Sequence, residues 1–157
     1  MTSSDLSLRR HVRALLTEPQ AHLTLEQVLN GFPLGRINER VEGVPYSAWE
    51  LLSHLRFTQR DILDFIREEA YHEPVWPDGY WPGQGKAATD EEWACELQAF
   101  GEDREALLAL LDDPQTDLFR VVPNGETQTY LRELLLVADH NAYHAGQLAL
   151  LRRLLEA

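Results

Sequence analysis

Apolar side chains recur at steps of three and four residues along most of the chain. This spacing places them on one face of an α-helix and leaves little of the chain for a sheet. Four helices that each bury one apolar stripe pack most simply as an antiparallel bundle. We therefore predict one all-α domain over residues 1–157, an up-and-down four-helix bundle. The long helices are predicted over residues 5–17, 47–68, 89–112 and 128–156, with a short extra helix over residues 24–30.

The starts of three predicted helices carry the capping-box pattern, in which Ser or Thr is followed three residues later by Glu or Gln. In such a box each side chain bonds the backbone N–H of the other residue, which satisfies two donors that a helix start leaves free. The pattern therefore predicts where these helices begin. The pairs are Thr24 with Gln27, Ser47 with Glu50, and Thr89 with Glu92.

Two connectors separate the long helices. Residues 71–89 hold three prolines, which prevent a continuous helix, and much aromatic surface, which is too apolar for a flexible linker. We expect this connector to pack on the bundle, with Trp76, Tyr80 and Trp81 as a hydrophobic plug, a dimer contact or a cover over a pocket. Residues 117–127 predict a brief extended stretch before a Pro-Asn-Gly turn.

Three histidines lie on the apolar faces of two predicted helices. His140 and His144 are four residues apart, so both project from one face of the last helix. His54 occupies the core face of the helix over residues 47–68. Burying these rings is unfavourable unless each finds a partner, and one metal ion would be a partner to all three. The residues that share these faces are Val137, Leu148, Leu151 and Leu155 on the last helix, and Leu51, Thr58, Ile62 and Phe65 around His54.

The spacing alone leaves two interpretations open. A histidine on an apolar face is often a hydrogen-bonded core residue, whereas three protein ligands with an open position are the pattern of a catalytic zinc site. His11, His22 and His72 show no matching geometry, so we expect them on the surface or in loops. We expect Cys95, the single cysteine, to be a small buried hydrophobic residue rather than a further ligand.

Composition and charge narrow the class of function. The chain has 26 acidic and 14 basic side chains, a formal net charge of -12. Nucleic acids and anionic membranes bind Lys and Arg, so neither is expected as a partner. A single cysteine allows no intramolecular disulfide, residues 1–13 lack the apolar core of a signal peptide, and no stretch reaches the roughly 20 uncharged residues of a membrane span. We expect a cytoplasmic protein.

Two segments carry a resemblance to a known family, the DinB-like superfamily of four-helix bundles. Residues 139–147 (DHNAYHAGQ) resemble its last helix, and residues 47–55 (SAWELLSHL) resemble its first metal-ligand helix. Residues 76–82 (WPDGYWP) and the following Glu92-Trp93 are similar to one of its branches, and the resemblance extends over about residues 6–155.

The resemblance implies a divalent metal ion, commonly zinc, nickel or iron, held by three histidines. The matching positions are His54, His140 and His144. An acidic residue often precedes the first of these histidines in relatives, whereas Ser53 stands there in this chain, which leaves the outer partners of His54 open.

The resemblance also implies a metal-dependent enzyme that acts on a small molecule. Members include thiol-dependent transferases that use bacillithiol or mycothiol, a maleylpyruvate isomerase and proteins described as metal-dependent hydrolases, and related bundles often form homodimers. Three neutral imidazoles leave the ion its charge, so a bound water or thiol loses its proton more easily. We therefore expect thiol transfer, with a low-molecular-weight thiol as cosubstrate, or hydrolysis. The alternatives are a non-catalytic metal- or ligand-binding bundle and a structural bundle with hydrogen-bonded histidines.

The sequence offers only weak candidates for a general base. Glu50 lies one turn before His54 and Asp61 lies two turns after it, so either side chain could approach the ion as an outer partner. Solvated surface positions are the commoner role for such residues, and Glu50 also caps its helix. Asn141 and Tyr143 fit the rim of the site as well as they fit core packing.

Overall fold

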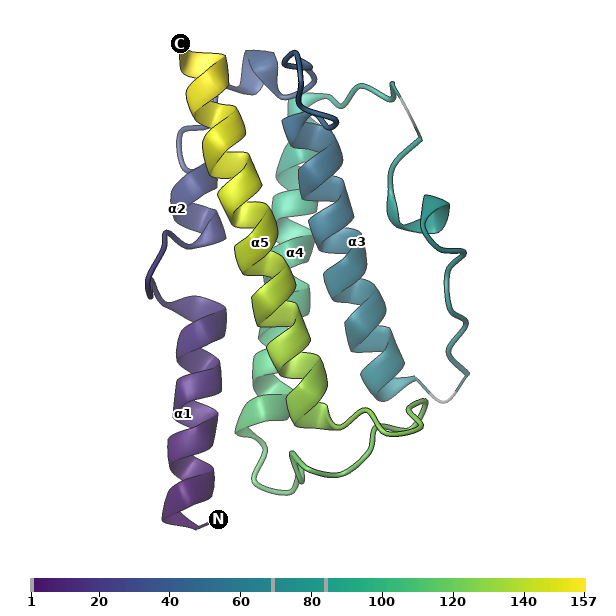
Figure 1. Ribbon diagram of the computed structural model, residues 1–157. Coiled ribbons are helices and arrows are strands. Elements are labelled where there is room, and N and C mark those ends of the chain that lie inside the picture. Colours follow the sequence, from purple (N-terminus) through teal and green to yellow (C-terminus); the bar gives the residue numbers. More distant parts are fainter. Residues whose placement is uncertain (1, 69, 84) are drawn as a thin grey trace.

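The computed structural model describes residues 2–68, 70–83 and 85–157 (Figure 1). These residues form helices and no β-strand, apart from an isolated bridge between Val121 and Thr129 in the second connector. The predicted all-α bundle with a short extra helix is confirmed. Its helices are α1 (Ser3–Thr17), α2 (Leu25–Leu29), α3 (Ala48–Arg67), α4 (Asp90–Asp112) and α5 (Tyr130–Glu156), with two short 3₁₀ turns, η1 (Leu34–Arg36) and η2 (Asp78–Tyr80).

Side-chain caps set where these helices begin. Thr2 and Thr129 accept a backbone N–H at the starts of α1 and α5. Each cap replaces a hydrogen bond that the first turn of a helix cannot make for itself. All three predicted capping boxes also form, with both reciprocal bonds present, at Thr24 with Gln27, Ser47 with Glu50, and Thr89 with Glu92.

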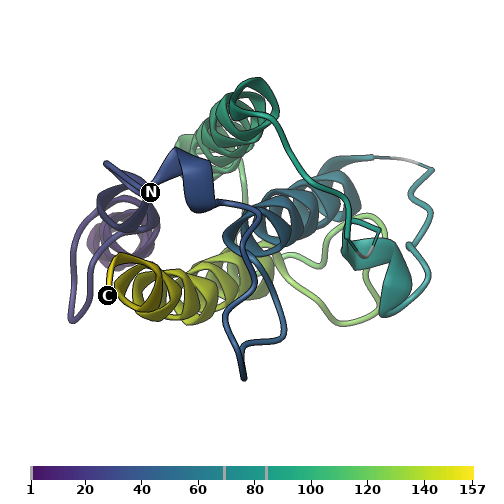
Figure 2. The same ribbon diagram turned by 90° about the horizontal axis from the view of Figure 1, so that it is seen from above.

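The long helices surround one core. α3 packs against both α4 and α5, and α1 packs against the same two helices from the other side, while α2 continues that wall along α5. Seen from above, the described parts of the connector, residues 70–83 and 85–89, lie outside α3 (Figure 2). α3 and α5 are therefore neighbours along much of their length, which brings the histidine-bearing segments side by side.

The direction of one helix corrects the predicted up-and-down order. α1 and α5 run one way, whereas α3 and α4 both run the other way (Figure 1). Arg56 lies 3.5 Å from Glu96. Further along both helices Arg60 lies 3.4 Å from Asp103, so α3 and α4 are parallel. A short connection between α3 and α4 would favour an antiparallel pair. The connector is instead long enough to run back along the roughly 30 Å of α3, so α4 can start beside the start of α3.

The apolar core has an upper and a lower part. Leu55 and Leu148 belong to the upper part, and Ile62 and Val137 belong to the lower part. Polar side chains lie between them. The best connected is Gln59, which is 1% exposed; it donates to the Phe100 carbonyl of α4 at 2.7 Å and accepts from Asn141 Nδ2 of α5 at 3.0 Å. This residue therefore joins three helices at the middle of the bundle.

One expectation about buried residues is wrong. Cys95 is exposed and not part of the core. The connector after α3 packs on the bundle through Tyr80 and Trp81, as expected, but Trp76 is 72% exposed. Within the described ranges, no helix is both long and apolar enough to cross a membrane.

Candidate metal centre

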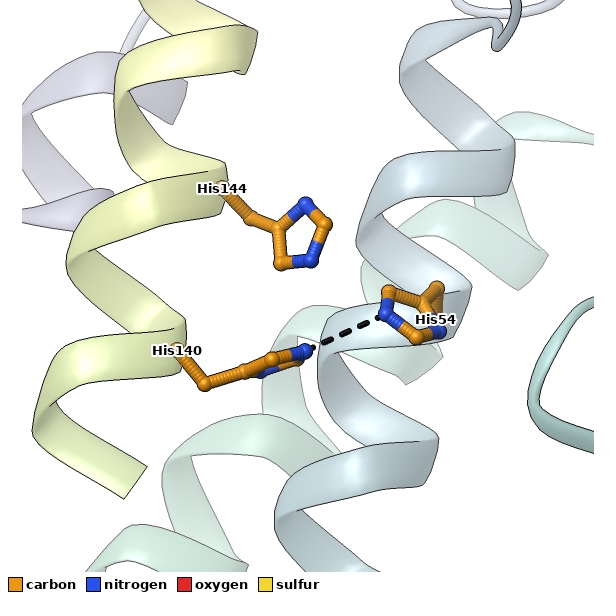
Figure 3. Close-up of side chains that lie close together, drawn as sticks. All are labelled: His54, His140 and His144. Atoms are coloured by element: carbon orange, nitrogen blue, oxygen red, sulfur yellow. Dashed lines mark hydrogen bonds between the residues drawn. The ribbon is translucent and has the colours of Figure 1, made fainter. Parts of the chain in front are cut away.

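The fold brings the three predicted histidines together at the middle of the bundle. His140 and His144 extend from α5 toward His54 on α3 (Figure 3). One nitrogen of each ring lies within 4.8 Å of a nitrogen of the other two. His54 and His144 are 4% and 6% exposed, and His140 is half-buried. Each ring therefore needs a partner inside the protein.

Helical spacing explains why all three rings point inward. Val137 precedes His140 by three residues and Leu148 follows His144 by four, and both of these apolar side chains are buried. The histidines thus continue the core stripe of α5, as the sequence predicts. On α3 the same argument holds for His54, because Leu51, three residues earlier, is also buried.

Hydrogen bonds orient two of the rings. His54 Nδ1 lies 2.8 Å from the Tyr80 carbonyl, which can only accept, so Nδ1 carries the proton and Nε2 can act only as an acceptor. His144 Nδ1 likewise donates to Gln147 Oε1 at 2.7 Å. Such outer partners commonly fix the tautomer and orientation of metal-binding histidines. Without an ion, His140 Nε2 donates to His54 Nε2 at 3.1 Å (Figure 3).

Aromatic rings enclose the centre. Trp81 stacks on His54 at 3.9 Å between ring centroids with 2° between the planes, and Tyr46 stacks on Trp81, also at 3.9 Å. Beyond this stack lies a cavity of about 480 Å³, which Tyr46 and Trp81 line together with Arg40 and Glu50. Trp81 therefore contacts His54 and also lines this cavity.

Burial lowers the pKa of all three imidazoles. For His140 burial is the largest cause and the neighbouring rings of His144 and His54 add to it, so the pKa falls from 6.5 to about 3. The pKa values of His54 and His144 are also lowered, mainly by burial, while hydrogen bonds to the Tyr80 carbonyl and to Gln147 partly oppose the shift. The rings are therefore neutral at neutral pH, the state that a metal ion requires of its ligands.

These residues fit a divalent ion. Two nitrogens that each lie about 2.0–2.1 Å from a tetrahedral zinc ion are roughly 3.3 Å apart, close to the 3.1 Å between the Nε2 atoms of His54 and His140. His54 and His144 already have outer partners on Nδ1, and their Nε2 atoms carry no proton. Imidazole donors suit zinc, iron and nickel alike, so the donor set leaves the identity of the metal open.

Glu50 and Asp61, the two candidates for a general base, form hydrogen bonds with residues outside the histidine cluster. Glu50 is buried, because its carboxylate pairs with Arg40 and closes the capping box of α3. Asp61 is half-buried and accepts from the hydroxyls of Tyr71 and Tyr80, each at 2.9 Å. The expectation that both are solvated surface charges is therefore wrong. In the part of the chain that the structure describes, no Asp or Glu joins the cluster of three histidines.

The remaining predicted residues lie outside the cluster. His11, His22 and His72 are exposed, as expected. Asn141 bonds Gln59 in the core and does not line the rim. Tyr143 is exposed, with its ring edge-on to His144 at 4.9 Å between centroids, a position at the rim.

The partners of His54 and His144 are the functional residues that sequence reasoning missed. Gln147 lies three residues after His144, a helical neighbour that the spacing alone could have identified. Tyr80 and Trp81 come from a connector 26 and 27 positions after His54, and the sequence contains no signal for a backbone carbonyl as a partner.

One comparison with known proteins identifies a family. The family model described as the DinB superfamily matches residues 9–148, which include all three histidines. No curated protein and no solved structure matches the chain.

Proposed function

The chain belongs to the DinB superfamily, and we propose that it is a metal-dependent enzyme that acts on a small molecule. His54, His140 and His144 would hold a divalent ion such as zinc, nickel or iron. An ion bound with an open coordination position supplies a Lewis acid that lowers the pKa of a water or thiol. The observation that carries the proposal is the convergence of three neutral imidazoles within 4.8 Å, two of them buried and one half-buried.

The chain's own residues contribute orientation and shielding. The Tyr80 carbonyl and Gln147 keep the protons of His54 and His144 on Nδ1, so the Nε2 atoms stay available. The stacked rings of Trp81 and Tyr46 exclude water from one side of His54. The adjoining cavity of about 480 Å³ is in the range of small-molecule pockets, and we assign substrate binding to it.

Metal analysis of the purified protein tests this proposal. We expect about one divalent ion per chain, lost in His54→Ala and in His140→Ala because two imidazoles do not retain it. His22→Ala, at an exposed histidine, is the matched control and should keep the ion. A metal-free protein would contradict the proposal, and a loss of stability in the first two variants of such a protein would favour a structural role for the histidines.

Turnover assays separate the two reactions. Thiol transfer requires a thiol together with an electrophile and stops when the thiol is withheld, whereas hydrolysis of an ester or amide proceeds without it. A second candidate function is metal or ligand binding without turnover. The bonds of Glu50 and Asp61 favour it, because they hold both carboxylates away from the base role. Metal-loaded protein that turns over neither kind of substrate would support this second function.

A further inference from the structure

Two consecutive residues of the connector hold the His54 ring. The Tyr80 carbonyl accepts the Nδ1 proton of His54 at 2.8 Å, in the plane of the imidazole. The indole of Trp81 covers the face of the same ring at 3.9 Å. An imidazole fixed at its edge and on its face keeps Nε2 directed at His140. The position of this dipeptide therefore sets the position of one candidate ligand.

The hydroxyl of Tyr80 anchors the dipeptide to α3. It donates to Asp61 Oδ2 at 2.9 Å, two helical turns after His54. Burial raises the pKa of Tyr80 to about 12, so the phenol keeps its proton and remains a donor. His54, Tyr80 and Asp61 thus form a closed loop of contacts that begins and ends on one rigid helix.

Tyr71 provides an internal comparison. Its hydroxyl donates to Asp61 Oδ1, also at 2.9 Å, and its ring packs on Phe65. Both phenols therefore hold the same connector to the same carboxylate. Only Tyr80 also bonds a histidine of the cluster.

We infer that Asp61 is a positioning residue for the metal centre, acting through the Tyr80 hydroxyl and carbonyl to orient His54. The inference rests on the proposed metal-binding function. Asp61 need not touch the ion, because each of its oxygens already takes one phenol. The Asp61 carboxylate acts on the His54 ring by way of the connector.

Zinc titration of the full chain against a chelator tests the inference with two matched variants. Tyr80→Phe removes the anchor and keeps the carbonyl, so we expect zinc affinity to fall about tenfold, the lower end for outer partners of metal ligands. Tyr71→Phe removes the equivalent bond to Asp61 and should stay within about twofold of the wild type. Asp61→Ala should resemble Tyr80→Phe, whereas Asp61→Asn keeps an acceptor oxygen and should restore most of the affinity.

A second measurement does not need the metal. In the zinc-free protein, nitrogen-15 NMR should show His54 with its proton on Nδ1 in the wild type and in Tyr71→Phe, and a mixture of tautomers in Tyr80→Phe. Circular dichroism and thermal unfolding of the zinc-free variants identify a general loss of structure. Such a loss would lower affinity in both phenylalanine variants together.

The outcomes distinguish the inference from the proposed function. Equal zinc affinity in the wild type, Tyr80→Phe and Tyr71→Phe overturns the inference and leaves the metal centre intact. Equal loss in both variants also overturns it, because Asp61 would then only stabilise the connector. A wild type that binds no zinc, nickel or iron overturns the proposed function, and the inference with it.

Discussion

At the scale of single residues, the amide of Gln147 is the outer partner whose role is easiest to isolate. It accepts the Nδ1 proton of His144 from three residues along the same helix. Leucine is similar in size to glutamine and is compatible with a helix, but it lacks the acceptor that fixes the tautomer of His144. The His144 ring then stays at the same position in the core, but no hydrogen bond at Nδ1 fixes its tautomer or its rotation.

We expect Gln147→Leu to weaken zinc binding by about 10–100-fold, the usual effect of removing an outer partner of a metal ligand. Competition with a chromogenic chelator measures this change. Gln98→Leu makes the same substitution at an exposed position of α4 and should leave affinity unaltered. Identical affinity in both variants would mean that the His144 bond has no influence on the site.

The sequence predicts which imidazoles meet, but not every group that surrounds them. His140 and His144 follow from helical spacing, which acts over one turn. The burial of Glu50 depends on Arg40, ten positions earlier in a loop, and nothing local to Glu50 signals that pairing. Cys95 lies on a helix whose apolar stripe is poorly defined, so its sequence neighbours could not show that it faces solvent.

At the scale of elements, the start of α3 supports the metal centre, because His54 lies within two turns of it. Ser47 is buried, and its hydroxyl accepts from the Glu50 N–H. The Glu50 carboxylate in turn accepts from the Ser47 N–H at 2.8 Å. A cap that is both buried and reciprocal leaves an unsatisfied donor when one half is removed.

We expect Ser47→Ala to lower the free energy of unfolding by about 1–2 kcal/mol, the range for the loss of an N-cap. Urea denaturation followed by circular dichroism measures it. Ser53→Ala makes the same change inside α3, where alanine is favoured, and should stay within about 0.5 kcal/mol of the wild type. A cost in Ser53→Ala equal to that in Ser47→Ala would show that the cap itself contributes nothing.

Helix lengths and starts could be predicted from the sequence, whereas the direction of α4 could not. Periodicity and caps are local, so they define α3 and α4 separately. The parallel arrangement of α3 and α4 depends on the path of the connector between them. Contacts of Tyr80 and Trp81 with α3 fix that path. Such contacts join residues far apart in the chain, beyond the reach of spacing rules.

At the scale of the whole molecule, three buried imidazoles couple folding to pH. In the metal-free folded chain the pKa of His140 is about 3, compared with 6.5 for an ordinary histidine. As the pH falls below about 6.5 the unfolded chain takes up a proton that the folded chain does not, so stability is lost progressively toward pH 3. The lowered pKa values of His54 and His144 act in the same direction.

We therefore expect the metal-free protein to lose about 1 kcal/mol through His140 alone between about pH 7 and pH 5.5. Urea titrations in the presence of a chelator measure the loss, and His140→Asn should flatten the slope. His22→Asn, at an exposed histidine, should leave the slope as it is. Stability that does not change over this interval in the wild type would contradict the lowered pKa values.

The polar side chains across the middle of the core also limit how the helices can slide. A shift of α5 by one turn, about 5.4 Å, would separate Asn141 from Gln59 and would move either His140 or His144 away from His54 into an apolar part of the core. Each buried group left unpaired costs about 1–3 kcal/mol, whereas leucines alone would tolerate the shift. The polar side chains at the middle of the core thus lock the register of the bundle, so the packing of the helices alone aligns the three imidazoles.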